Sequence, residues 1–137
     1  MPLRTKNIQA REYVFCPWRR KWVRLTPEER VRQTYLLYLV EQCGYPFSRI
    51  AVEAYLPSGQ RSDAIVYDQH LQPMVLIEFK APTVPLTAAV LDQAAVYNRM
   101  VHVPLLILHN GEQTVVAQVD ENQIHFLSYL PAYGDTH

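Results

Sequence analysis

Glycine is scarce in this chain of 137 residues. The four glycines are Gly44, Gly59, Gly111 and Gly134. None of them belongs to a GxxxxGK[ST] pattern, the loop whose backbone binds nucleotide phosphates. The sequence also holds no internal repeat and no low-complexity tract. A P-loop nucleotide site and a repeat architecture are therefore both excluded for these residues.

Cysteine and long apolar runs are scarce as well. The two cysteines, Cys16 and Cys43, lack CxxC or metal-ligand spacing, which favours reduced thiols over a disulfide framework. The five histidines have no ligand-like spacing either. The first residues lack the apolar core of a signal peptide, and the apolar runs 35–40 and 103–108 are too short to span a bilayer. We expect a cytoplasmic protein without a membrane segment.

The net charge is zero, but the charges are unevenly distributed. Residues 1–32 hold nine of the thirteen Lys and Arg and three of the thirteen acids, so this segment is +6 and the remainder is −6. The aromatic residues interleaved with these cations are Tyr13, Phe15, Trp18 and Trp22. Such a segment suits contact with phosphates and bases, and Arg19, Arg20, Lys21 and Arg24 are its candidate DNA-binding cations. The alternative is a solubilising arm whose aromatic rings pack on the domain.

Length and a hydrophobic content of 49% predict one domain with one core. We expect this domain at residues 26–130, after a basic aromatic segment at 1–25 and before a tail at 131–137. Thr26-Pro27-Glu28-Glu29 predicts a helix start, with Thr26 as N-cap and Pro27 as its first residue.

Periodicity and turn residues predict the remaining elements. The first helix ends near residue 42, and a second helix covers about 86–100. The expected strands are 50–57, 63–67, 75–81, 103–109, 114–119 and 123–130. The order of helix, three strands, helix and further strands predicts an α/β fold of the α+β type, with helices flanking a central mixed sheet.

Three charged side chains interrupt strands that otherwise read as buried. Alternation places Glu78 and Lys80 on one face of their strand. The link between residues 67 and 75 is short enough for an antiparallel pair that brings Asp63 near Glu78. Two carboxylates and an ammonium can hold a divalent cation such as Mg²⁺ and stabilise developing negative charge. The alternative is a cross-strand ion pair of Glu78 and Lys80 on a solvated face, with Asp63 as a turn residue.

The second helix carries an amide and a phenol on its apolar stripe. Gln93 and Tyr97 lie one turn apart and point together, in line with Val90. A buried amide is costly unless it is hydrogen-bonded, so Gln93 either caps a backbone group or reaches a polar site. We predict the polar site.

Asp63 followed by Glu78-Phe79-Lys80 resembles the Asp…Glu-X-Lys core of the PD-(D/E)XK nuclease superfamily, which has a restriction-endonuclease-like core. More closely, residues 13–111 resemble the N-terminal nuclease domain of type I restriction enzyme R subunits. The matching pieces are Lys21-Trp-Val-Arg-Leu-Thr-Pro-Glu-Glu, Val31-Arg-Gln33, Gly44-Tyr-Pro46, Arg61-Ser-Asp63, Glu78-Phe-Lys80-Ala-Pro82, Gln93-Ala-Ala-Val-Tyr97 and His109-Asn-Gly111. Ser62 departs from the pattern, because proline often precedes the first Asp.

The resemblance implies a role for each matching residue. Asp63, Glu78 and the backbone carbonyl of Phe79 would bind Mg²⁺ or Mn²⁺. Lys80 would position or activate the attacking water and stabilise the pentacovalent phosphate. Gln93 and Tyr97 would line the site and approach DNA. An acid of the first helix often joins such a site, and Glu29 is preferred over Glu28.

The sequence thus predicts a metal-dependent DNA endonuclease-type domain that hydrolyses phosphodiester bonds. DNA is the expected partner, together with other restriction-system subunits or a second copy of the chain. Type I R subunits carry an ATP-driven motor, for which these residues hold no phosphate loop. One alternative is a non-catalytic DNA-binding or partner-docking module. Another is a structural protein in which the three charged residues merely pair.

Overall fold

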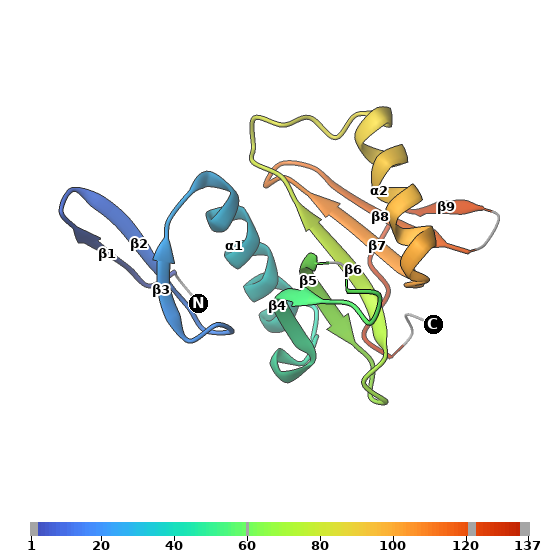
Figure 1. Ribbon diagram of the computed structural model, residues 1–137, viewed down its shortest axis with the longest axis horizontal. Helices are drawn as coiled ribbons and strands as arrows, with labels where there is room; N and C mark the ends of the chain where they lie inside the picture. The colour runs from blue at the N-terminus through green and yellow to red at the C-terminus, as the bar shows by residue number, and fades with distance from the viewer. Residues whose placement is uncertain (1–2, 60, 121–122, 135–137) are drawn as a thin grey trace.

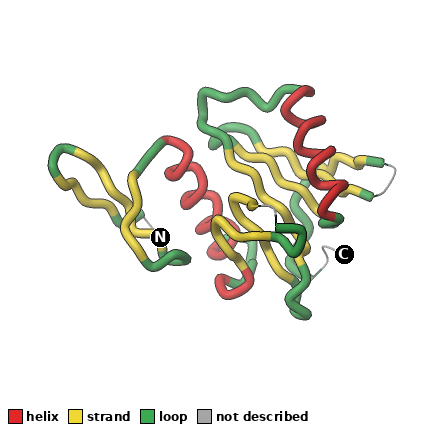
Figure 2. Tube along the Cα trace, in the orientation of Figure 1, coloured by secondary structure: helices red, strands yellow, loops and turns green. Residues whose placement is uncertain are grey.

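Two sheets and two helices make up the fold of the computed structural model (Figures 1 and 2). The structure describes residues 3–59, 61–120 and 123–134, and within the second helix it describes the backbone but not the side chains of 97–101. The strands are β1 (Thr5–Ile8), β2 (Arg11–Cys16), β3 (Lys21–Arg24), β4 (Ile50–Tyr55), β5 (Arg61–Tyr67), β6 (Pro73–Phe79), β7 (Leu105–His109), β8 (Thr114–Val119) and β9 (Ile124–Leu127). The helices are α1 (Pro27–Glu41), a 3₁₀ turn (Phe47–Arg49) and α2 (Ala88–Val101).

The larger sheet has six strands in the order β4-β5-β6-β7-β8-β9. All neighbours are antiparallel except β6 and β7, which run parallel because α2 carries the chain from one to the other. The predicted mixed sheet with flanking helices is confirmed, and each predicted strand falls on a strand of this sheet.

Side-chain alternation divides the core between the two faces of this sheet. Ala64, Val75 and Ile77 lie on the face that packs against Leu36 and other residues of α1. Their sequence neighbours Ile65 and Leu76 lie on the opposite face, together with Ala94 of α2. The central strands are therefore apolar on both sides, as expected for strands covered by helices.

Helix α1 begins as its sequence predicts. The Thr26 hydroxyl accepts a hydrogen bond from the backbone N–H of Glu29 at 3.0 Å, and Pro27 occupies the first turn, where a missing N–H costs nothing. Neither described helix is long and apolar enough to cross a membrane.

Residues 5–24 form a three-stranded antiparallel sheet that the sequence analysis did not anticipate. Two-residue hairpin turns usually contain Asn-Gly, because both central residues need positive φ. Here Gln9 and Ala10 adopt φ of 50° and 65°, so the usual turn sequence is missing between β1 and β2. In addition, β1 reads Thr-Lys-Asn-Ile and is exposed throughout, so it lacks the apolar alternation of a half-buried strand. This N-terminal sheet lies on the far side of α1 from the six-stranded sheet (Figure 1).

The predicted C-terminal tail reaches the core. The Tyr133 hydroxyl donates to the carbonyl of Tyr67 at 2.8 Å, and the Tyr45 hydroxyl donates to the carbonyl of Pro131 at 2.6 Å. Residues 131–133 are thus fixed to the domain by the buried phenol of Tyr45 and the half-buried phenol of Tyr133.

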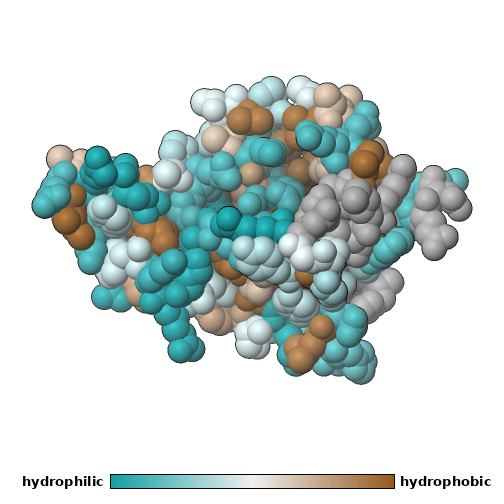
Figure 3. Space-filling model, in the orientation of Figure 1, coloured by the Kyte–Doolittle hydropathy of each residue, from teal (hydrophilic) through white to brown (hydrophobic). Residues whose placement is uncertain are grey.

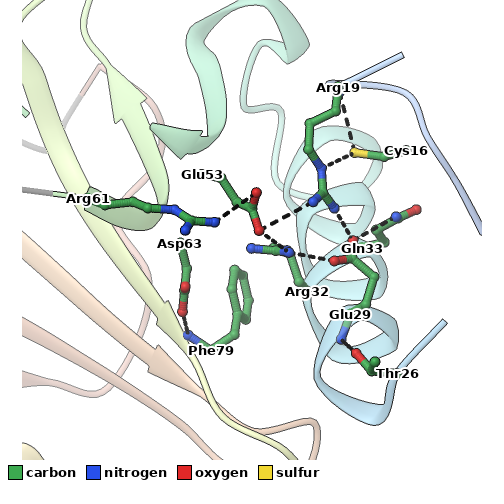
Figure 4. Close-up of polar contacts among 10 residues, drawn as sticks. All are labelled: Cys16, Arg19, Thr26, Glu29, Arg32, Gln33, Glu53, Arg61, Asp63 and Phe79. Carbon is green, nitrogen blue, oxygen red and sulfur yellow. Dashed lines mark hydrogen bonds and ion pairs between the residues drawn. The ribbon is translucent and has the colours of Figure 1, made fainter. Parts of the chain in front are cut away.

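A charged cluster ties the N-terminal sheet to α1 and β4 (Figure 4). Glu29 is 5% exposed, and its carboxylate accepts from Arg19 and Arg32 at 2.5 Å each and from Gln33 at 2.8 Å. Glu53 lies 3.4 Å from Arg19 and 3.2 Å from Arg32. Burial alone would raise the pKa of Glu29, but the hydrogen bonds from Arg32, Gln33 and Arg19 outweigh it and lower that pKa.

Replacing Glu29 by alanine removes the carboxylate and leaves the buried Arg32 and the half-buried Arg19 short of a partner. We expect Glu29→Ala to lower the free energy of unfolding by about 2–5 kcal/mol, measured by urea denaturation at pH 7. Glu28→Ala is the matched control, because Glu28 is the neighbouring acid of the same first turn and is exposed. Its expected cost is below about 1 kcal/mol. Equal losses in the two variants would contradict a stabilising role for the cluster.

Candidate functional site

The pairing of β5 with β6 brings Asp63 and Glu78 together. Ala64 stands opposite Ile77, so the next residues along the two strands are Asp63 and Glu78. The Asp63 carboxylate accepts a hydrogen bond from the backbone N–H of Phe79 at 2.8 Å, which fixes it against β6. The predicted antiparallel pair is confirmed, and so is the nearness of the two carboxylates.

A pocket of about 290 Å³ opens beside this pair, between the ends of β5, β6 and β7 and helix α2. Three of its lining residues are the predicted site residues Glu78, Lys80 and Gln93. The remaining lining residues are Arg61, Val90, Ala94 and Leu108. Asp63 is not among the lining residues, but it interacts with Glu78. The structure therefore gathers four residues of the predicted site around one cavity and its wall.

Burial and charge act together on Glu78. Burial, repulsion from the adjacent Asp63 carboxylate and a hydrogen bond shared with it together raise the pKa of the Glu78 carboxyl to about 8. The Lys80 ammonium and the Ser62 hydroxyl, 3.5 Å from Glu78 Oε1, act in the opposite direction on this pKa and are outweighed. The net effect favours the protonated form of Glu78.

Lys80 follows β6, and its backbone N–H donates to the carbonyl of His109 at 3.0 Å. The ion pairs within the described part of the chain do not include Glu78 with Lys80. The two side chains line the same pocket without closing on each other. This arrangement disfavours the alternative in which they form a plain cross-strand ion pair.

Gln93 lies at the pocket, but the prediction that its amide is buried is wrong. It is exposed instead of buried in an apolar helix face, so no burial cost forces its amide to find a partner. Its predicted neighbour Tyr97 lies outside the residues whose side chains the structure describes.

Arg61 is a site residue that the sequence analysis did not single out. Its side chain lines the pocket and lies 2.9 Å from the Glu53 carboxylate. Residues two apart on a strand share a face, so its position two residues before Asp63 was the available indication. Glu53 itself has φ of 52°, a left-handed conformation that is costly for a side chain other than glycine. That conformation coincides with a carboxylate that three arginines contact.

Glu29 and Arg19 do not support their predicted roles. Both oxygens of Glu29 accept hydrogen bonds from Arg19, Arg32 and Gln33, so the carboxylate is engaged elsewhere instead of facing Asp63 and Glu78. Arg19 is half-buried, because the same ion pair and the Cys16 sulfur hold it. The other three predicted DNA-binding cations, Arg20, Lys21 and Arg24, are exposed on the N-terminal sheet.

The donor set for a metal is small. Within the described ranges, no three His, Cys, Asp or Glu side chains come together as a metal site. Asp63 and Glu78 are the two carboxylates at the pocket. Mg²⁺ is commonly bound by one or two carboxylates, with water and substrate phosphates completing its shell, so this pair of oxygen donors fits such a cation.

The raised pKa of Glu78 predicts a pH dependence of stability in EDTA. An acid whose folded pKa lies above its unfolded value contributes stability below about pH 4.5 that is lost as the pH rises through about 8. The melting temperature of the wild type should therefore fall between pH 5 and pH 9. Glu78→Gln keeps the shape without the ionisation, and its melting temperature should exceed that of the wild type at pH 9 by roughly 5 °C or more. If the difference in melting temperature between the two proteins stayed constant from pH 5 to pH 9, the pKa of Glu78 would not be raised.

Comparisons with known proteins identify the family of this chain. Residues 27–131 match the family described as Type I restriction enzyme R protein N terminus. A solved fragment of a protein described as an HsdR subunit of a type I restriction enzyme from Vibrio vulnificus YJ016 has the same fold, with a TM-score of 0.59 and 16% identity. The match covers 82% of this chain and 24% of that one, so this chain spans about a quarter of its length.

The structure of a DrdV-DNA complex also matches, with a TM-score of 0.49 and 19% identity over 81% of this chain and 11% of that chain. No curated protein matches the chain. The family match extends over most of the sequence and contains α1, both helix-flanked faces of the sheet and the pocket. The chain therefore belongs to the family of type I restriction enzyme R protein N-terminal domains.

Proposed function

We propose that this chain is a metal-dependent nuclease domain of the PD-(D/E)XK type that hydrolyses phosphodiester bonds of DNA. The observation that carries the proposal is the pocket itself, where Glu78, Lys80 and Gln93 line one cavity and Asp63 meets Glu78 at its wall. Membership of the restriction-enzyme family supports DNA as the substrate. Other subunits of a restriction system are the expected partners.

Asp63 and Glu78 are the residues that would hold Mg²⁺ or Mn²⁺, with the Phe79 carbonyl as a further ligand. When bound there, the cation would supply polarisation of the scissile phosphate and a lowered pKa of bound water. The fixed position of Asp63, whose carboxylate is hydrogen-bonded to the N–H of Phe79, preorganises half of this ligand pair. Glu78 must lose its proton to become the other half.

The cationic residues of the pocket act on the phosphate. The Lys80 ammonium carries three hydrogen-bond donors, and it can orient the attacking water and bind a non-bridging oxygen. Arg61 presents a planar guanidinium to the same cavity, suited to two parallel bonds to a phosphate. Both charges would stabilise the additional negative charge of the transition state, and Gln93 would contact the DNA at the mouth of the pocket.

A second candidate is a non-catalytic module that binds DNA or docks a partner. The small donor set favours it, because only two carboxylates adjoin the pocket within the described residues. The two candidates differ in turnover, so one assay separates them.

The test is nicking of supercoiled plasmid DNA by the purified chain with Mg²⁺ or Mn²⁺. We expect Asp63→Asn, Glu78→Gln and Lys80→Met each to lower the nicking rate at least about 100-fold, because each removes a ligand or a charge needed in the transition state. Glu112→Gln is the control, since it removes one carboxylate from an exposed turn that does not line the pocket. Its rate should equal that of the wild type.

If no nicking is observed, measurements of DNA and Mn²⁺ binding distinguish the two candidates. Wild-type protein that binds DNA, takes up no Mn²⁺ in a calorimetric titration and never nicks would favour the non-catalytic module. Mn²⁺ uptake that persists in Asp63→Asn and Glu78→Gln would place the metal elsewhere and contradict the assigned ligands.

A replacement of Arg61 separates phosphate binding from metal binding. We expect Arg61→Gln to lower the nicking rate about 10-fold or more while Mn²⁺ uptake stays unchanged, because the guanidinium contacts phosphate and not the cation. Arg61→Lys should recover only part of the rate, since lysine cannot form two parallel bonds. Loss of Mn²⁺ uptake in Arg61→Gln would mean that Arg61 acts by positioning the carboxylates.

A further inference from the structure

One face of the N-terminal sheet carries cations of a single sign interleaved with aromatic rings. By register, Lys6 stands beside Tyr13, which stands beside Arg24, and Phe15 stands beside Trp22. Arg4 and Arg11 continue the same face, which we name the basic face. We propose that the basic face binds the phosphate backbone of duplex DNA at a distance from the pocket.

The opposite face of this sheet is the one that packs on the domain. Val14 and Cys16 are 0% and 1% exposed, and alternation points them away from Tyr13 and Phe15. The four cations of the basic face, Arg4, Lys6, Arg11 and Arg24, are exposed. Figure 3 shows hydrophilic and hydrophobic residues side by side on the N-terminal sheet, at the left of the view. The basic face is therefore open to a partner.

The aromatic rings hold the cations in place. The Lys6 ammonium lies 4.0 Å from the centre of the Trp22 ring, and the Arg4 guanidinium lies 5.4 Å from the same ring and 5.3 Å from that of Phe15. Arg24 lies 5.9 Å from the Tyr13 ring. The electrostatic attraction between a cation and a ring face favours these positions of the side chains. The charges are thus partly ordered before a partner arrives, which lowers the entropy lost on binding.

Within the described strands β1 to β3, no acidic side chain shares the basic face. The nearest acid along β2 is Glu12, and its register partner is Asn7 on the opposite face. Cations on neighbouring strands repel one another, and a sheet stabilised for its own sake would alternate the two signs. A partner that is a continuous row of negative charges removes this repulsion, and the phosphate backbone is such a row.

The rings favour backbone contact over base stacking. Stacking needs a free ring face, as in proteins that bind single strands. Here Arg4 and Lys6 cover Trp22, and Phe15 packs against Trp22 edge to face at 5.6 Å. The geometry therefore points to double-stranded DNA, whose bases stay stacked.

The inference rests on the proposed function in its choice of DNA, but it concerns other residues. The basic face lies between residues 4 and 24, before the matched range begins at 27. The cations of the basic face differ from the DNA-binding cations predicted from sequence. Arg19 is held in the charged cluster, and Lys21 is the register partner of Cys16, on the opposite face. Arg24 alone belongs to both sets.

The experiment measures binding in EDTA, so that cleavage plays no part. Fluorescence anisotropy of a labelled 30-base-pair duplex is recorded against protein at several salt concentrations. The face variant combines Arg4→Gln, Lys6→Gln, Arg11→Gln and Arg24→Gln. The control variant removes the same charge through four cations outside the basic face, by Arg20→Gln, Lys21→Gln, Arg30→Gln and Arg49→Gln. Because Arg20 and Lys21 belong to the set predicted from sequence, the two variants also decide between that set and the basic face. Thermal melting establishes that both variants are folded.

We expect the face variant to bind roughly 10- to 100-fold more weakly at low salt, and its slope of log Kd against log salt to fall by about 2 to 4. The control variant should stay within about threefold of the wild type. Equal losses in both variants would overturn the proposal, because net charge alone would then explain binding. Absence of duplex binding by the wild type would also overturn it, and so would tighter binding of a single strand that is lost in Trp22→Leu.

Asp63→Asn separates this proposal from the proposed function. It should bind the duplex like the wild type in EDTA. The wild type could fail to nick plasmid DNA while the face variant still binds the duplex more weakly than the wild type. That result would refute the proposed nuclease activity and support DNA binding by the basic face.

Discussion

In the β5–β6 pair, Ala64 stands opposite Ile77, and the arrangement of the pocket follows from this register. Because side chains alternate, a slip by one residue would turn Glu78 into the apolar core beneath α1 and bring Ile77 to the pocket. Both faces of these strands are apolar, so the apolar residues alone do not distinguish the two registers. The charged residue does, because a carboxylate in the core beneath α1 would be buried without a partner. The cost of burying Glu78 on that face therefore helps to fix the relative position of Asp63 and Glu78.

A second constraint joins the pocket to the N-terminal sheet through charge. Glu53 contacts Arg61 at the pocket and Arg19 and Arg32 on the other side, and Glu29 contacts the last two. Cations exceed acids in this cluster, so neither carboxylate can be lost without leaving buried arginine charge uncompensated. The position of the N-terminal sheet and the position of Arg61 consequently depend on the same carboxylate. The N-terminal sheet, which carries the basic face, is thereby joined to the wall of the pocket through the ion pairs of Glu53.

The sequence predicts the elements whose periodicity agrees with their environment. Strands β5 to β8 and helix α1 are of this kind, because alternation, caps and apolar runs all indicate the same structure. The N-terminal sheet escaped because Gln9 and Ala10 make a turn that sequence rules assign to Asn-Gly. Glu29 shows another limit. An acid in a first helical turn can cap, ligate or pair, and the packing of Arg19 against it decides, which no local pattern contains. Gln93 reached the pocket although its assumed burial was wrong.

The charge balance of the pocket bears on how the proposed site would attract both a cation and a phosphate. Two ionised carboxylates would repel a phosphate, but burial and the neighbouring Asp63 carboxylate raise the pKa of Glu78 and so favour its protonated form. Lys80 and Arg61 line the same pocket, and Arg61 is partly compensated by Glu53. A divalent cation bound as proposed would displace the proton from Glu78, add positive charge to the site and strengthen its attraction for phosphate. Proton and metal would then compete for Glu78, while metal and phosphate would reinforce each other. That coupling would depend on the burial of Glu78, which the helix-covered sheet provides.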